Sequence, residues 1–188
     1  IKETKRSDIC FAADLTDYPR LWTILDKIGK YIVICKIHFD AIDELYRDTF
    51  KQKIIELSIT HDFLIMEDRK FNDISYIVQR QYKPFQNWVD LITVHSLVTP
   101  NVVKSLSGVL LVANMSNNNY DFSNNALELA NTHKENVVGF ISQQRIHSDF
   151  ICMTPGIGKS AQRIDDQVHK PVAEIDADIK IIGRALYN

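Results

Sequence analysis

The sequence predicts an α/β fold in which parallel strands and the helices between them close into a (β/α)₈ TIM barrel. Short runs rich in β-branched residues alternate with helical patterns along the whole chain, there are eight such runs, and each is almost continuously apolar. Strands of a parallel sheet are covered on both faces, so they read as unbroken apolar runs. Eight repeated βα units favour the closed barrel over an open, doubly wound sheet.

The eight expected strands are 9–14, 31–38, 63–68, 89–95, 109–114, 137–142, 150–154 and 179–183. Two stripes of apolar residues at helical spacing, 21–28 and 74–82, predict helices after the first and third strands. Asp17 precedes the first stripe and is expected to cap that helix.

The length of 188 residues favours one compact barrel domain spanning 1–188. Barrels of this kind usually have about 250 residues, so the connecting loops are expected to be short. The chain ends soon after the eighth strand, so we expect the final helix of the barrel to be absent from it.

Composition excludes several classes of partner. With 45% hydrophobic residues and a net charge of −2, the chain has the balance of a globular protein and no basic footprint for nucleic acid or an anionic membrane. It has no apolar run near the roughly 20 residues that span a bilayer. Cys10, Cys35 and Cys152 are widely spaced and lie in apolar stretches, which indicates buried thiols in a reducing, cytoplasmic location.

Polar residues cluster where the predicted strands end, on the face of a barrel that carries active sites. They are Asp14, Lys36, His38, Asp68, Lys70, His95, Asn114, Ser116, Thr154 and Arg184. Any one of them could be structural, but a burial cost of several kcal/mol for each unpaired ionised group makes their convergence at one rim informative.

The densest pattern is Asp68-x-Lys70-x-x-Asp73, which is expected to run from the third strand into the following helix. Two carboxylates beside an ammonium keep it charged and fixed, so Lys70 could donate a proton to a carbon atom that gains negative charge. A solvated charge run at a helix start is the commoner origin of such a string. Lys36 and Asp14 favour the alternating charge network instead.

A second pattern, Met-Thr-Pro-Gly-Ile-Gly at 153–158, follows the seventh strand, and Gly183-Arg184 follows the eighth. Loops at these two positions of a barrel often bind phosphate through backbone N–H groups, and an arginine can hold it bidentately. The six histidines lack the spacing of metal ligands, so no metal site is expected.

With these motifs the chain resembles the orotidine 5′-monophosphate decarboxylase family. The specific matches are Asp-Arg-Lys-Phe-Asn-Asp-Ile at 68–74 and Lys-Ile-His-Phe-Asp at 36–40, supported by Ala-Ala-Asp at 12–14, Met-Thr-Pro-Gly-Ile at 153–157 and Ile-Gly-Arg at 182–184. They occur in the family's order, from about residue 9 to 187. The resemblance implies cofactor-free decarboxylation of orotidine 5′-monophosphate to uridine 5′-monophosphate in pyrimidine biosynthesis.

The resemblance also implies roles for individual residues. Lys70 would protonate C6 of the pyrimidine, held by Asp68 and by Asp73 from the other subunit of a homodimer with sites at its interface. Lys36 would belong to the charge network and bind the ribose together with Asp14. The other implied substrate-binding residues are His38, Ile74, Ser116, Pro155, Gln162, Gly183 and Arg184, with Gln162 bridging base and phosphate, Gly183 and Arg184 holding the phosphate, and Ile74 walling the carboxylate.

Two alternatives stay open. One is a Mg²⁺-dependent sugar-phosphate decarboxylase or synthase of the same superfamily, which shares the Asp-x-Lys-x-x-Asp pattern. The other is a catalytically silent nucleotide-binding domain, in a polypeptide that could also carry an orotate phosphoribosyltransferase domain. The element Lys36-x-His38 and Gln162 favour the pyrimidine enzyme over the first, and the complete charge network argues against the second.

Overall fold

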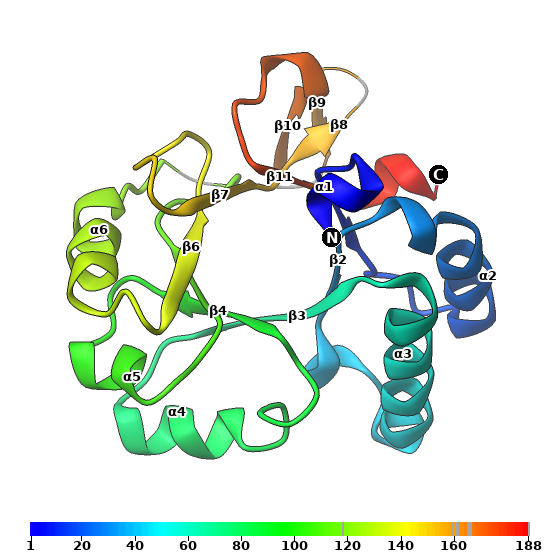
Figure 1. Ribbon diagram of the computed structural model, residues 1–188, viewed down its shortest axis with the longest axis horizontal. Helices are drawn as coiled ribbons and strands as arrows, with labels where there is room; N and C mark the ends of the chain where they lie inside the picture. Colours follow the sequence, from blue (N-terminus) through cyan, green and yellow to red (C-terminus); the bar gives the residue numbers. More distant parts are fainter. Residues whose placement is uncertain (118, 159, 161, 165–166, 188) are drawn as a thin grey trace.

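A computed structural model describes the chain except for residues 118, 159, 161, 165, 166 and 188, with only the backbone described at 162–164. Its main feature is a closed barrel of parallel strands in the order β1-β11-β7-β6-β5-β4-β3-β2, which confirms the predicted architecture (Figure 1). The barrel strands are β1 (Ile9–Ala12), β2 (Ile34–Ile37), β3 (Leu64–Phe71), β4 (Leu91–His95), β5 (Val109–Val112), β6 (Val137–Ile141), β7 (Ile151–Thr154) and β11 (Ile179–Ile182). Each corresponds to one of the predicted runs, and β1 closes the barrel by pairing with β11 in the register Ile9↔Lys180.

Helices surround the barrel, as Figure 1 shows for α2 to α6. The α-helices are α1 (Lys2–Lys5), α2 (Tyr18–Ile28), α3 (Arg47–His61), α4 (Ser75–Tyr82), α5 (Pro100–Lys104) and α6 (Ser123–Thr132). The 3₁₀ helices are η1 (Gly29–Tyr31), η2 (Phe39–Ala41), η3 (Glu44–Tyr46), η4 (Val172–Glu174) and η5 (Arg184–Leu186). The side chain of Asp17 accepts the backbone N–H of Arg20 at 3.1 Å, so the predicted cap of α2 is confirmed.

A second, small sheet lies between β7 and β11, where a short loop was expected, so that expectation was wrong. It consists of β8 (Ile157–Gly158), β9 (Gln162–Ile164) and β10 (Gln167–Pro171), in the order β8-β10-β9. β10 pairs parallel with β8 and antiparallel with β9. In Figure 1 this sheet projects from the ring of barrel strands.

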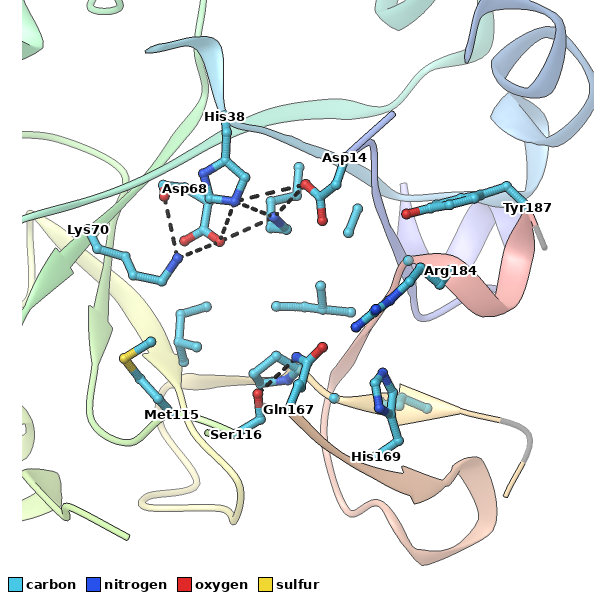
Figure 2. A pocket seen from close by; sticks show the side chains of 18 residues that line it. Asp14, His38, Asp68, Lys70, Met115, Ser116, Gln167, His169, Arg184 and Tyr187 are labelled. Atoms are coloured by element: carbon cyan, nitrogen blue, oxygen red, sulfur yellow. Dashed lines mark hydrogen bonds and ion pairs between the residues drawn. The ribbon is translucent and has the colours of Figure 1, made fainter. Parts of the chain in front are cut away.

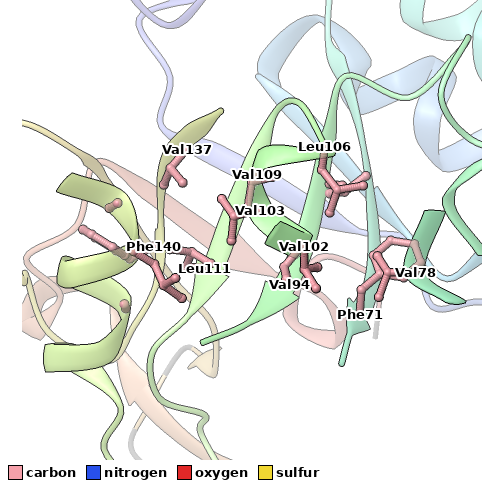
Figure 3. Packing of buried hydrophobic residues seen from close by; sticks show 14 of the residues in the cluster. Phe71, Val78, Val94, Val102, Val103, Leu106, Val109, Leu111, Val137 and Phe140 are labelled. Atoms are coloured by element: carbon pink, nitrogen blue, oxygen red, sulfur yellow. The ribbon is translucent and has the colours of Figure 1, made fainter. Parts of the chain in front are cut away.

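The apolar core has two layers, one inside the barrel and one between the barrel and its helices. In β5, Leu110 and Val112 belong to the interior cluster, whereas Val109 and Leu111 pack in the outer cluster with residues of α5 and α6 (Figure 3). Because successive side chains of a strand point to opposite faces, both faces of β5 are apolar. This arrangement explains the unbroken apolar runs of the sequence.

The three cysteines are buried and carry free thiols. Among the described residues, every helix is too short or too polar to cross a bilayer.

Candidate active site

The alternation of side chains along the barrel strands brings the polar residues into the barrel mouth. Ile34 of β2 lies in the interior cluster, so Lys36 two residues later faces the same way. In β3 the interior residue Met66 is followed at the same spacing by Asp68. The strand ends therefore place Lys36 and Asp68 side by side at the carboxyl end of the barrel.

These residues form one continuous charge network. The Lys36 ammonium lies 3.2 Å from a carboxylate oxygen of Asp14 and 3.2 Å from Asp68 Oδ2. Lys70 Nζ lies 2.9 Å from the same Asp68 oxygen. His38 Nε2 is 2.9 Å from Lys36 Nζ and 3.5 Å from Asp68 Oδ2. The predicted alternation of lysines and aspartates is thus present in three dimensions.

Burial and pairing together fix the charges of this network. Lys36 is 6% exposed and Asp68 9% exposed. Burial alone would raise the pKa of Asp68, but Lys36 and Lys70 outweigh it and hold that pKa at about 2. Burial would lower the pKa of Lys36, but Asp68 and Asp14 raise it above its usual range. Burial and the Lys36 ammonium lower the pKa of His38, so its neutral ring can accept a hydrogen bond from Lys36.

Lys70 has an unusual backbone conformation, with a φ of 52°. The pairing of β3 with β4 shifts register between Glu67 and Phe71, so the strand bulges at this point. The hydroxyl of Thr93 on β4 accepts the Lys70 N–H at 2.9 Å and donates to Asp68 Oδ1 at 2.9 Å. Asp68 and Lys70 are therefore both part of β3. The position of Lys70 is determined by a bulge in this strand, whereas the sequence had suggested the start of a helix.

The network borders a cavity of about 440 Å³, a size typical of small-molecule sites. The remaining lining comes from barrel strands, from the loops after them and from the small sheet (Figure 2). The lining residues that had been predicted from the sequence are Asp14, Lys36, His38, Asp68, Lys70, Ser116, Pro155, Gly183 and Arg184. In Figure 2 the charge network lies at one end of the cavity, and Arg184 reaches toward the other.

Of the residues to which the resemblance assigns a role, three are not brought into this cavity by the described side chains. Asp73 is exposed, and its carboxylate accepts the N–H of Ile74 at 2.7 Å. Ile74 itself is 67% exposed. The side chain of Gln162 lies outside the described part of the chain. His95, Asn114 and Thr154, predicted from the strand ends to lie at the same rim, do not line the cavity either.

The structure adds residues that the sequence did not indicate. Gln167 lines the cavity and donates from Nε2 to Ser116 Oγ at 2.8 Å. Gly156 permits this arrangement because it has no side chain. Its φ is 74°, and a Cβ at this position would lie 2.6 Å from the carbonyl oxygen of Val168 on β10 and close to Ser116. His169, on the same strand, also lines the cavity.

Among the residues that the structure describes, one group of side chains has ligand atoms close enough to hold a metal: His38, Asp40 and Glu67, whose ligand atoms lie within 4.8 Å of one another. Glu67 accepts the backbone N–H of Phe39 at 2.9 Å, and Asp40 pairs with Arg69 at 3.1 Å. Burial raises the pKa of Glu67 to about 8, which makes it a poor ligand at neutral pH. These contacts give the group a structural role without an ion.

Comparisons with known proteins identify the family of this chain. The family model described as "Orotidine 5′-phosphate decarboxylase / HUMPS family" matches residues 7–188. The orotidine 5′-phosphate decarboxylase of Pichia kudriavzevii is 32% identical over 220 residues, which cover 100% of this chain and 82% of that protein. The uridine 5′-monophosphate synthase of Bos taurus is 32% identical over 209 residues, covering 99% of this chain and 43% of that protein.

Solved structures show the same fold. The orotidine 5′-phosphate decarboxylase of Pyrococcus horikoshii OT3 has a TM-score of 0.72 and 23% identity, covering 96% of this chain and 91% of that one. The enzyme of Methanocaldococcus jannaschii, solved with the inhibitor BMP, has a TM-score of 0.70 and 20% identity, covering 95% and 90%. The length of the family match and the identity to the full-length relatives establish that this chain belongs to the orotidine 5′-phosphate decarboxylase / HUMPS family.

Proposed function

We propose that this chain decarboxylates orotidine 5′-monophosphate to uridine 5′-monophosphate without a cofactor. The observation that carries the proposal is the network in which Asp68 contacts both Lys36 and Lys70 at the cavity wall. It places an ionised carboxylate and a proton donor beside one another. The named relatives support the choice of substrate.

The proposed reaction needs only groups of the protein. The bond from C6 to the carboxylate carbon breaks, CO₂ leaves, and the electron pair stays on C6. The Lys70 ammonium gives its proton to C6, forming the C–H bond of the product, and is reprotonated from solvent. Asp68, ionised because its pKa is about 2, keeps Lys70 in place.

Magnitudes assign the larger effect to Lys70. A substrate carboxylate about 4 Å from Asp68 would be repelled by about 4 kcal/mol at an effective dielectric constant near 20. Enzymes commonly lower barriers by about 8–23 kcal/mol. Relief of repulsion is therefore too small by itself, and electrostatic stabilisation of the carbanion by Lys70, with binding energy from the phosphate, supplies the larger share.

The rest of the cavity suits the other parts of the substrate. Asp14 and Lys36, which contact each other at the cavity wall, would bind the ribose hydroxyls, with His38 supporting Lys36. Ser116 would bind the pyrimidine, beside Pro155, and Arg184 with the Gly183 backbone would hold the phosphate. Gln162 keeps its proposed role between base and phosphate.

The site is proposed to be completed in a homodimer. Asp73 and Ile74 lie outside the cavity of the single chain, and the exposed side chains around them include apolar ones, Ile74 and Tyr76. A second copy packed on this surface would bury these side chains. Asp73 and Ile74 of each chain would then enter the site of the other chain. We further propose a cytoplasmic location, which localisation of a tagged protein would test. We also propose that this domain can be fused to an orotate phosphoribosyltransferase domain, which transcript sequencing would test.

The ultraviolet absorbance of orotidine 5′-monophosphate, followed in chelator-treated buffer, tests the proposed reaction. We expect the wild type and the surface control Lys134→Ala to remove the substrate spectrum and Lys70→Ala to leave it. Mg²⁺-dependent turnover of a sugar phosphate, with the orotidine 5′-monophosphate spectrum unchanged, would favour the sugar-phosphate branch of the family. Folded wild type that binds uridine 5′-monophosphate without turnover would indicate a silent nucleotide-binding domain.

A further inference from the structure

His169 of β10 is a buried histidine to which neither the sequence analysis nor the proposed reaction assigns a role. It is 8% exposed, lines the cavity, and its Nδ1 has no hydrogen-bond partner among the described residues. Figure 2 shows its ring at the end of the cavity where Arg184 and Gln167 converge, away from Lys70 and Asp68. Leaving a buried nitrogen unpaired costs about 1–3 kcal/mol, so such a group calls for an explanation.

The small sheet holds this ring in position. The N–H of Lys170 donates to the carbonyl of Gly156 at 2.8 Å, which ties β10 to the loop after β7. Gly158 of β8 faces His169, and a Cβ at that glycine would lie 3.4 Å from the Cβ of His169. The histidine is therefore placed by the backbone around it, although its Nδ1 gains no hydrogen bond there.

Among the described residues, the polar side chains nearest His169 are cationic or neutral, and none of them is a carboxylate. Arg184 of η5 and Tyr187, which follows η5, line the same cavity, and Gln167 and Lys170 are neighbours of His169 on β10. The two carboxylates of the described lining, Asp14 and Asp68, are both paired with Lys36. Burial and the Arg184 charge lower the pKa of His169, so the ring is neutral in the free protein near pH 7.

We propose that His169 is a second ligand of the substrate's phosphoryl group, beside Arg184, and that it binds the phosphoryl dianion in its protonated form. This inference rests on the proposed function, because that function supplies the phosphoryl group. The proton comes from solvent, so nucleotide binding takes up one proton at His169. Two cations at one end of the cavity suit a dianion better than a single arginine does.

The proton uptake has a defined sign and pH window. A bound dianion raises the pKa of His169 above its value in the free protein. Below the free-protein pKa the ring is already protonated and affinity is greatest. As pH rises from there through the pKa of the complex, the contribution of His169 to affinity is lost. The phosphate's own second pKa, about 6, affects wild type and variants alike.

Calorimetric titration of uridine 5′-monophosphate near pH 7, in two buffers of different ionisation enthalpy, tests this inference. We expect the wild type to take up more protons than His169→Gln, and this variant to bind the nucleotide roughly tenfold to a hundredfold more weakly, as expected for loss of a charge-assisted hydrogen bond. Uridine, which lacks the phosphoryl group, should bind both equally. His133→Gln, which removes another buried histidine with an unpaired ring nitrogen outside the cavity lining, should match the wild type.

Nuclear magnetic resonance titration of the His169 ring in the wild type gives a second readout that needs no variant to fold. A rise in its pKa on nucleotide binding supports the inference. An unchanged pKa, or a folded His169→Gln variant with wild-type affinity and proton uptake, overturns it while decarboxylation persists. Wild type that neither binds the nucleotide nor decarboxylates the substrate overturns the proposed function together with this inference.

Discussion

The backbone N–H of Lys70 donates to the hydroxyl of Thr93, and the two atoms lie 2.9 Å apart. The same hydroxyl donates to Asp68, so one side chain on β4 fixes both the proposed proton donor and its carboxylate partner on β3. Thr93 is fully buried, and solvent cannot replace either bond. Thr93 is thus a positioning residue for the proposed reaction.

Thr93→Val should therefore lower kcat more than it raises KM. Its methyl group fills the space of the hydroxyl but leaves the Lys70 N–H and one Asp68 oxygen without their partner. Hydrogen bonds to charged groups contribute about 1.5–3 kcal/mol, so kcat should fall roughly tenfold to a hundredfold. Steady-state kinetics with Thr93→Ser as the control, which keeps the hydroxyl, checks this; equal kcat values for the two variants would show that the Thr93 hydroxyl does not position Lys70 and Asp68.

Gln167→Ala should raise KM roughly tenfold, because Gln167 lines the cavity and is held by Ser116 at 2.8 Å. Gln162, the glutamine expected from the resemblance, lies five residues earlier, and its side chain is outside the described part. Measuring KM for Gln167→Ala, Gln162→Ala and the surface control Gln52→Ala separates the two assignments. A raised KM for Gln162→Ala alone would restore the original assignment and exclude Gln167.

The barrel was predictable because its strands carry a pattern that physics imposes. Each strand is buried on both faces, as β5 shows with Leu110 inside and Leu111 outside, so the run in the sequence is continuous. Spacing by two likewise predicted that Lys36 of β2 and His38, just beyond the end of that strand, lie close together. These parts of the site follow from periodicity and strand ends alone.

The remaining parts of the site have no such pattern. β10 reads Gln-Val-His-Lys-Pro, without an apolar period, so neither the small sheet nor His169 could be located. Thr93 resembles any β-branched strand residue until its neighbours are known. The bulge that sets Lys70 depends on how β3 and β4 pair, which is a long-range property.

Glu67 should make the protein less stable as pH rises. It is fully buried, and burial raises its pKa to about 8, from an ordinary value near 4.5. A carboxyl whose pKa is raised in the folded state binds a proton there that the unfolded chain has lost. The free energy of unfolding therefore decreases between about pH 4.5 and 8, by a few kcal/mol at most.

Urea unfolding of Glu67→Gln at pH 5.5 and 8.5 checks this prediction. The neutral glutamine removes the titration, so the variant should lose less stability over this range than the wild type. Glu56→Gln, at an exposed glutamate of α3, should keep the wild-type difference. Equal losses for Glu67→Gln and wild type would mean that Glu67 is ionised in the folded protein.

Mixing Lys70→Ala with Asp73→Ala should restore activity that neither variant has alone. Asp73 lies outside the cavity of its own chain, and its carboxylate accepts a hydrogen bond from the N–H of Ile74. A contribution of Asp73 to catalysis therefore requires a second copy of the chain. In a hybrid dimer one site contains both lesions and the other contains neither. Random exchange of equal amounts makes half the dimers hybrid, so about one quarter of wild-type activity should return. Sedimentation with differently labelled chains shows whether exchange occurred; exchanged dimers that stay inactive would place Asp73 outside the partner's site.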